Sequence, residues 1–467
     1  MRTSSSTSAN VAAFIHELQF ADAPAEVRQQ TRRCLLDTLG VAFAGTQLPI
    51  AQIVWRFVTQ HLGVGEGPAA RLIRDGRRVS VPGAAMAGAA IIDGYDAHDG
   101  HALCKGHMGV TVIPAALAFA DATALDDWDE LLSLVLLGYE IGTRSGIALH
   151  ATSPVMHSSG AWNALAAAAI GARVLRLGVE QTVQALGVAE YYGPRSPLMR
   201  VIVHPTMVKD GSTMGAFAGV SAAYLAQDGF TGAPAETIEA DARTHNPQVW
   251  GDVGSRWRIL EQYFKPVPVC RWTQPATEAV QALFSTHPGL THALVRSVEI
   301  ETFHEAVSLA CRAPVETDAA QYSTPFVVSA MLVHGRLTPA ELAGAGLNDA
   351  RVLELSRTMS LVESAEFSAR FPAERWARVR LTMNDGTVLD SGAHTTRGDP
   401  DTPLSDQAIS AKFRANSEPA VGEATAKRIE QTIQSADSPL SAFLDVVLTP
   451  TRLDAAAVTQ RRDSPGS

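Results

Sequence analysis

The sequence predicts a mainly helical protein with a smaller α+β domain, and three observations lead to this fold class. Residues 10 to about 265 are rich in alanine, and their apolar residues recur at helical spacing. After about residue 290, apolar and polar residues alternate, as they do in half-buried strands. The chain returns to a helical pattern over residues 405–460. We therefore expect an all-helical domain over residues 1–265, completed by 399–467, with an α+β domain inserted over 266–398.

The expected helices follow one another along the first part of the chain. Asn10 can cap the helix Val11–Leu18, since asparagine is a favoured N-cap residue. Glu26–Ala44 has its leucines on one helical face, and Pro114 suits the first turn of a helix over 112–125. Alanine lets helices approach closely, so this part should form a tightly packed core. Further helices are expected over residues 84–93, Asp126–Ala148, Ala161–Leu177, Val179–Gly187 and Ser212–Asp228.

The α+β domain is predicted from three alternating runs. Ala293–Phe303 and Trp376–Met383 alternate apolar and polar residues, which is typical of strands with one buried face. Asn384-Asp385-Gly386 follows, and then a third run, Thr387–Ala393. Because Asx-Gly between alternating runs is a strong hairpin signal, we expect the second and third runs to pair. Asp399 and the prolines after it mark the end of this domain, and Arg461–Ser467 look frayed.

Composition excludes several classes of protein. Lys and Arg number 38 against 48 Asp and Glu, a net charge of −10 without a basic run, so nucleic-acid binding is not expected. The N-terminus does not resemble a signal peptide, and the most apolar runs contain charges, so we expect a soluble cytoplasmic protein that does not bind membranes. The four cysteines form no CxxC pair and predict neither a zinc ribbon nor a disulfide framework: Cys34, Cys104, Cys270 and Cys311.

The most unusual stretch is Asp93–His107, which lies between two alanine-rich helices. Loops held by a rigid scaffold are where catalytic groups concentrate. A solvated loop with incidental histidines is the plain alternative, and a metal site is a further one because Asp and His are metal ligands. The spacing matches no standard metal motif, so no metal is expected. The stretch holds Asp93, Asp96, His98, Asp99, His101 and His107.

Three further segments carry candidate groups. His157-Ser-Ser-Gly160 comes just before a helix, whose N-terminus can bind an anion. Lys209-Asp-Gly-Ser-Thr213 also precedes a helix. In Lys265-Pro-Val-Pro-Val-Cys-Arg-Trp272, two prolines hold the backbone extended, which would orient Lys265 and Arg271 reproducibly. Each segment alone is a weak signal, since a lone lysine is usually a solvated surface charge.

In their order along the chain, these segments resemble the MmgE/PrpD family. The family's Asp-rich loop and His-Pro-Gly motif correspond to Asp96–Asp99 and His107–Gly109. Its Lys-Pro-Tyr-Pro-Cys-Cys segment corresponds to Lys265–Cys270, so the resemblance extends beyond the helical part. Other motifs of the family correspond to Pro114–Ala118, Gly138–Glu140 with Arg144, His157–Trp162, Lys209 and Phe230–Ala233.

The resemblance implies an all-helical domain with an α+β lid domain, a homodimer, and no metal or organic cofactor. Members of the family include 2-methylcitrate dehydratase, cis-aconitate decarboxylase and iminodisuccinate epimerase, which act on small polycarboxylates. The family's catalytic residues carry over to Asp96, His107, His157, Lys209 and Lys265.

Departures from the family pattern direct the choice among these activities. Met108 replaces the proline of His-Pro-Gly, and His98 stands where a second acid is common. Phe326 aligns with the decarboxylases' site tyrosine, and Gln274 stands where a histidine is expected. The chain is therefore most similar to the epimerase. We expect a cofactor-free epimerase acting on an iminodicarboxylate such as iminodisuccinate, with a hydro-lyase or decarboxylase acting on a tricarboxylate as the alternative. A catalytically silent scaffold is the third interpretation.

The residue types fit α-proton abstraction and return. The enolate-like intermediate needs fixed cations where charge develops, and Lys209, Lys265 and Arg144 could supply them. A base with a pKa near neutrality favours histidine. Which group acts on which face of the substrate stays open. The residues expected to bind substrate are His98, His101, Tyr139, Arg144 and Arg271.

Overall fold

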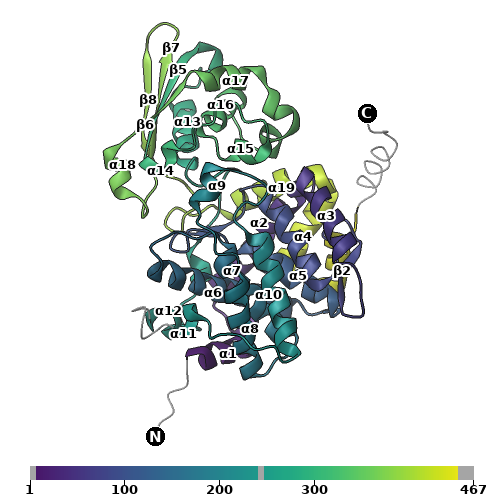
Figure 1. The fold of residues 1–467 in the computed structure, drawn as a ribbon. Helices are drawn as coiled ribbons and strands as arrows, with labels where there is room; N and C mark the ends of the chain where they lie inside the picture. The colour runs from purple at the N-terminus through teal and green to yellow at the C-terminus, as the bar shows by residue number, and fades with distance from the viewer. Residues whose placement is uncertain (1–6, 240–246, 451–467) are drawn as a thin grey trace.

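A computed structural model describes residues 7–239 and 247–450, and it places the helices and the main sheet in two bodies (Figure 1). The lower body in Figure 1 contains the helices of the first half of the chain, most of them where the sequence predicts them. They are α1 (Thr7–Glu17), α2 (Ala25–Gly45), α3 (Pro49–His61), α4 (Val81–Asp93), α5 (Gly109–Ala122), α6 (Trp128–Thr152), α7 (Gly160–Val174), α8 (Val179–Tyr192), α9 (Met199–Val203), α10 (Ser212–Gln227), α11 (Glu236–Glu239) and α12 (Pro247–Gly251).

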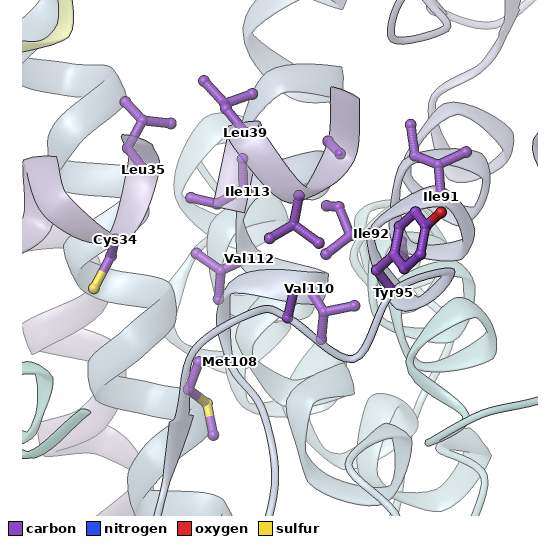
Figure 2. Close-up of a cluster of buried hydrophobic side chains, with 14 of the residues drawn as sticks. Cys34, Leu35, Leu39, Ile91, Ile92, Tyr95, Met108, Val110, Val112 and Ile113 are labelled. Carbon is purple, nitrogen blue, oxygen red and sulfur yellow. The ribbon is translucent and has the colours of Figure 1, made fainter. Parts of the chain in front are cut away.

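Small residues allow the buried helices to pack closely. In Figure 2, Leu39 of α2, Ile92 of α4 and Ile113 of α5 gather in one apolar cluster. The expected place of Pro114 in the first turn of its helix is wrong, because α5 begins at Gly109 and Pro114 lies inside it. The proline ring packs against α4 at Gly88, where a β-carbon would overlap it. Among the described residues, two short antiparallel strand pairs belong to this body: β1 (Ala69–Arg71) with β2 (Arg78–Ser80), and β3 (Gly100–His101) with β4 (Gln262–Tyr263).

The upper body in Figure 1 is the expected α+β part. Its sheet has the strand order β6-β5-β7-β8, in which β5 and β6 are parallel and the other pairs are antiparallel. The predicted hairpin is confirmed, and the Met383 amide donates to the Thr387 carbonyl across its turn at 2.8 Å. The sequence prediction lacked β6. The elements are α13 (Gln274–Thr286), β5 (Val295–Thr302), α14 (His304–Val307), α15 (Thr317–Gln321), α16 (Thr324–His334), α17 (Ala350–Arg357), β6 (Met359–Glu363), α18 (Ala365–Arg370), β7 (Ala377–Met383) and β8 (Val388–His394).

The C-terminal helices return to the first body. They are α19 (Asp406–Val421), α20 (Glu423–Ser435) and α21 (Leu440–Leu448). In Figure 1, α19 lies beside α2, and the Phe413 ring lies against Gly40, where a β-carbon would come within 3.0 Å of it. This arrangement agrees with a helical body built from both ends of the chain. The domain limits themselves stay predictions, and Arg461–Ser467 lie outside the described residues.

Among the described residues, no single helix is long and apolar enough to cross a membrane. The pair α2 and α3 passes that length and composition test only when taken together, and the two helices meet at an angle of 91°. The expected cytoplasmic location stays a prediction.

We predict that Gly45→Ala destabilises the helical body. A β-carbon at Gly45 would overlap the backbone carbonyl of Ile91, which no side-chain rotation can relieve. Overpacking of this kind lowers the free energy of unfolding by about 3 kcal/mol, measurable by equilibrium urea unfolding. Gly65→Ala is the matched control, since a β-carbon there meets nothing within 4 Å. Equal stability of the two variants would contradict the close approach of α2 and α4.

Candidate active site

A cavity of about 620 Å³, part of it open to solvent, lies where the two bodies meet. Its lining combines the Asp-rich loop, the segment around α9, the Lys265–Trp272 segment and the loop after α18. The apolar wall is formed by Met156, Leu198, Val201, Ile202, Trp272, Phe371 and Pro372. The polar lining consists of Asp96, His101, Lys105, His107, Asp210, Tyr263, Lys265, Arg271, Tyr322 and Arg375, with Cys270 between them.

An ion pair between Lys265 and Asp96 forms the floor of the site. The Lys265 side chain is fully buried, and its ammonium donates to the Asp96 carboxylate and to the Asp96 carbonyl, the latter at 3.1 Å. Burial alone would raise the pKa of the Asp96 carboxyl, but the charge of Lys265, together with His107 and His98, holds it well below its usual range. Asp96 is therefore a carboxylate at neutral pH.

His107 lies beside this pair with one nitrogen committed to the protein. Its Nδ1 donates to the Asp99 carbonyl at 2.6 Å, which leaves Nε2 facing Asp96 Oδ1 at 3.8 Å. Burial lowers the pKa of His107 well below its usual value, and the charges of Lys265 and His98 lower it further. The imidazole is neutral at pH 7, so Nε2 can accept a proton.

The His107 backbone is linked to a second acid. The His107 amide donates to Ser159 Oγ at 2.9 Å, and the Ser159 hydroxyl donates to Asp210 Oδ2. Asp210 Oδ1 is buried and has no hydrogen-bond partner in the part of the chain that the structure describes. Burial, and then the nearby Asp93 charge, raise the pKa of Asp210 well above its usual value. Burial thus favours the protonated form of the Asp210 carboxyl, which lines the cavity and which the sequence interpretation did not single out.

Gln321 of α15 fastens the Asp-rich loop to the α+β body. Its Oε1 accepts from the Asp96 amide at 2.7 Å and from Lys209 Nζ at 2.9 Å, and its amide nitrogen donates to the Gly94 carbonyl at 3.0 Å. Lys209 also pairs with Asp318 at 2.9 Å. The lysine is buried outside the cavity lining, so it joins the two bodies through α15 and does not reach into the cavity.

Two of the residues expected to bind substrate use their side chains in hydrogen bonds and ion pairs within the protein. The Tyr139 hydroxyl donates to the Asp99 carboxylate, which also accepts from the Gly109 amide at 3.1 Å. Arg144 is fully buried, pairs with Asp252 and donates to the Arg256 carbonyl at 2.6 Å. Neither side chain lines the cavity. Tyr139 supports the Asp-rich loop through Asp99, and Arg144 links α6 to the segment after α12.

The histidines are divided between the cavity and its surroundings. His101 lines the cavity, with Nε2 3.0 Å from Glu261. His98 lies behind His107, 4.4 Å between ring centroids, and its Nε2 is 3.3 Å from Asp93. His157 lies in the loop between α6 and α7, where its Nδ1 donates to the Val155 carbonyl at 2.9 Å, outside the cavity lining.

Several lining residues have no signal in the sequence. Lys105 is a single lysine in a loop, and Arg375 is one of several arginines before β7. Tyr322 faces the cavity, whereas Phe326, which aligns with the family's site tyrosine, is buried in α16. Only the folded arrangement of the two bodies shows which of these side chains reach the cavity.

The donor set does not fit a metal ion. Asp96, His98 and His107 each offer a ligand atom, and these atoms lie within 4.8 Å of one another. The Lys265 ammonium already occupies the Asp96 carboxylate, so a divalent cation there would be repelled at short range. The cluster is better described as a buried hydrogen-bonding and charge network.

We predict strong energetic coupling between Lys265 and Asp96. Lys265→Met leaves a buried carboxylate unpaired, which costs about 3–5 kcal/mol of unfolding free energy. The loss of unfolding free energy in the double variant Asp96→Asn/Lys265→Met should be smaller than the sum of the two single losses by about 1–3 kcal/mol. Urea unfolding of the four proteins measures this, with Lys427→Met at an exposed position as the control. Additive losses would show that the pair is not coupled.

Comparisons with known proteins match most of the chain. The MmgE/PrpD N-terminal domain matches residues 9–246, and the MmgE/PrpD C-terminal domain matches residues 267–438. The chain is 22% identical to cis-aconitate decarboxylase of Aspergillus terreus over 470 residues, 92% of this chain and 94% of the relative. It is 24% identical to the human cis-aconitate decarboxylase over 432 residues, 86% of each chain. The chain therefore belongs to the MmgE/PrpD family.

Proposed function

We propose that the protein is a carboxy-lyase that decarboxylates an unsaturated tricarboxylate of the cis-aconitate type. The observation that carries this proposal is the similarity to cis-aconitate decarboxylases along nearly the whole chain, through both family domains. The expected similarity to iminodisuccinate epimerase has no such support, so epimerisation becomes the second candidate. The charge and geometry of the cavity are consistent with decarboxylation.

The cavity has an excess of positive charge suited to a trianion. Lys265 is balanced by Asp96, and burial favours the uncharged form of Asp210, so the remaining lining cations face the cavity with little compensation. These are Lys105, Arg271 and Arg375, of which Arg271 alone has a carboxylate partner, Asp399, among the described residues. Fixed cations in a site of low dielectric constant stabilise polycarboxylates and the charge that develops on them.

Decarboxylation requires stabilisation of an electron pair and then a proton. When the carbon–carboxylate bond breaks, carbon dioxide leaves and the bonding pair moves into the conjugated alkene and carboxylate. A proton then adds to carbon, so that one proton replaces the lost carboxylate group. The Lys265 ammonium is placed to stabilise the delocalised charge.

Two groups can deliver the proton. Asp210 is one, because it lines the cavity and burial favours its protonated form. His107 is neutral in the free protein, but a bound trianion would raise its pKa and let Nε2 carry a proton to the substrate. Ser159 Oγ accepts from the backbone amide of His107 and its hydroxyl donates to the Asp210 carboxyl, which links the two residues.

Two departures from the family pattern no longer argue against decarboxylation once the positions of the residues are known. The absence of tyrosine at Phe326 argued for epimerisation, but Tyr322 of the same segment lines the cavity. Gln274 does not line the cavity. Its amide donates to the Val267 and Val269 carbonyls and so supports the Lys265 segment. Neither position now disfavours decarboxylation.

We also propose a homodimer, as the family resemblance implies. Support comes from exposed large apolar side chains at the ends of α8 and α9, between α9 and α10, and in the first turn of α10. They are Tyr191, Tyr192, Val203, Met207, Val208 and Met214. Burial of these side chains against a second copy would remove them from water. Light scattering of the purified protein measures the mass.

We predict that the full-length protein incubated with cis-aconitate in D₂O releases carbon dioxide. The product should be a dicarboxylate with one carbon-bound deuterium, detectable by mass spectrometry and proton NMR. Deuterium exchange and inversion of iminodisuccinate without carbon dioxide release would support the epimerase instead. Loss of water from a hydroxytricarboxylate, seen as new ultraviolet absorbance, would support the hydro-lyase.

A second prediction separates the two candidate catalytic histidines. His107→Asn should lower kcat/KM by about 10²–10⁴, as expected for loss of a proton-transfer group. His157→Asn should stay within about 5-fold of the wild type, because His157 lies outside the cavity lining and loses no proton-transfer role. Steady-state carbon dioxide release measures both. A larger loss for His157→Asn would show that the loop between α6 and α7 closes over the substrate.

A further inference from the structure

One side of the cavity carries a cluster of basic groups that the chemistry at Asp96 and Lys265 does not use. The cluster consists of Lys105, Arg271 and Arg375. We propose that these three side chains form a carboxylate-binding subsite and that Arg375, from the α+β body, is its specificity-determining residue. The inference rests on the proposed function only in that the ligand is a polycarboxylate.

Arg271 has free donors that are ready to bind an anion. One end of its guanidinium pairs with Asp399, and the group lies over the Tyr263 ring, 4.4 Å from the ring centroid. Its Nε and Nη1 are buried, and within the described ranges of the chain they have no hydrogen-bond partner. An unpaired buried donor is costly, and a carboxylate oxygen would satisfy it.

Arg375 also has an unpaired buried donor, and unlike Arg271 it forms no salt bridge with a described carboxylate. It lies between α18 and β7, with its guanidinium 5.7 Å from the Phe371 ring centroid. Its Nε is buried without a partner, and no carboxylate of the described residues pairs with it. The neighbouring Arg370 differs, since it pairs with Glu366 at 2.7 Å and with Glu374 at 3.5 Å. Arg375 is thus the arginine of this segment that lines the cavity without a salt bridge to a described carboxylate, and Asp399 acts on it only from a longer distance.

Lys105 completes the cluster from the Asp-rich loop. Its backbone has a φ of 53°, a left-handed conformation that is unfavourable for lysine and is held by the surrounding loop. Burial, and then the charge of Arg375, lower the pKa of Lys105. Burial also lowers the pKa of Arg375, with the charge of Arg271 acting in the same direction. The three cations therefore repel one another in the free protein, and a carboxylate between them would turn this repulsion into attraction.

The subsite also joins the two bodies of the protein. Lys105 belongs to the helical body, and Arg375 belongs to the α+β body. A carboxylate held between them adds a contact across the cavity. Because guanidinium binds carboxylate through two parallel hydrogen bonds, Arg375 would fix the orientation of the substrate as well as its charge.

The test is calorimetric binding of propane-1,2,3-tricarboxylate, a saturated probe that cannot react. We expect Arg375→Gln to raise its Kd by about 10–100-fold, the range for charged hydrogen bonds, and Arg375→Lys to give an intermediate value. Arg370→Gln is the matched control and should bind like the wild type. Steady-state assays with cis-aconitate should show a similar rise in KM for Arg375→Gln, with kcat changed by less than about 3-fold.

Unchanged probe affinity in a folded Arg375→Gln protein would overturn the subsite. Circular dichroism and the thermal midpoint establish folding, and Lys105→Gln, which should also raise the Kd, decides the matter if Arg375→Gln unfolds. Binding of the probe needs no turnover. Wild-type binding that depends on Arg375, without carbon dioxide release from cis-aconitate, would therefore refute the proposed function and leave the subsite standing.

Discussion

The site depends on the burial of one ammonium group, that of Lys265. A lysine without solvent contact is stable only if an anion and further acceptors lie within hydrogen-bond distance, and Asp96 supplies both a carboxylate and a carbonyl. This requirement fixes two segments against each other that are far apart in the sequence. On the Lys265 side, the Gln274 amide holds the carbonyls of Val267 and Val269. On the Asp96 side, Gln321 holds the backbone amide.

The Asp-rich loop is also held by α19, a helix of the C-terminal part of the chain. Lys412 of α19 pairs with the buried Asp37 of α2 at 2.7 Å and donates to the Ala97 carbonyl at 2.6 Å. This contact explains why helices from the C-terminal part belong to the helical body. Without α19, the Asp37 carboxylate would lose its cation and the loop would lose a support next to Asp96. The position of the loop, the packing of α19 on α2 and the charge balance of Asp37 thus depend on the same contacts of Lys412.

Sequence patterns predicted the parts of the structure that depend on local spacing. The long alanine-rich helices and the hairpin at Asn384-Asp385-Gly386 follow from periodicity and turn chemistry. Strand β6 was missed because it is short and mostly exposed, which gives it no clear alternation. Of the residues expected at the site, Asp96, His101, His107, Lys265 and Arg271 line the cavity. Lys209 and Arg144 are cationic side chains too, but they pair with Asp318 and Asp252, carboxylates distant in sequence, and do not line the cavity. No local pattern contains that information.

The charge state of the cavity depends on what occupies it. In the free protein, burial and nearby cations keep His107 neutral, burial favours the protonated form of Asp210, and three basic groups line the same cavity. Under the proposed function, a bound polycarboxylate would pair with these cations and would raise the pKa of His107. A neutral ligand in the same space would not raise it, so the ligand itself would help to protonate His107, one of the two candidate proton donors.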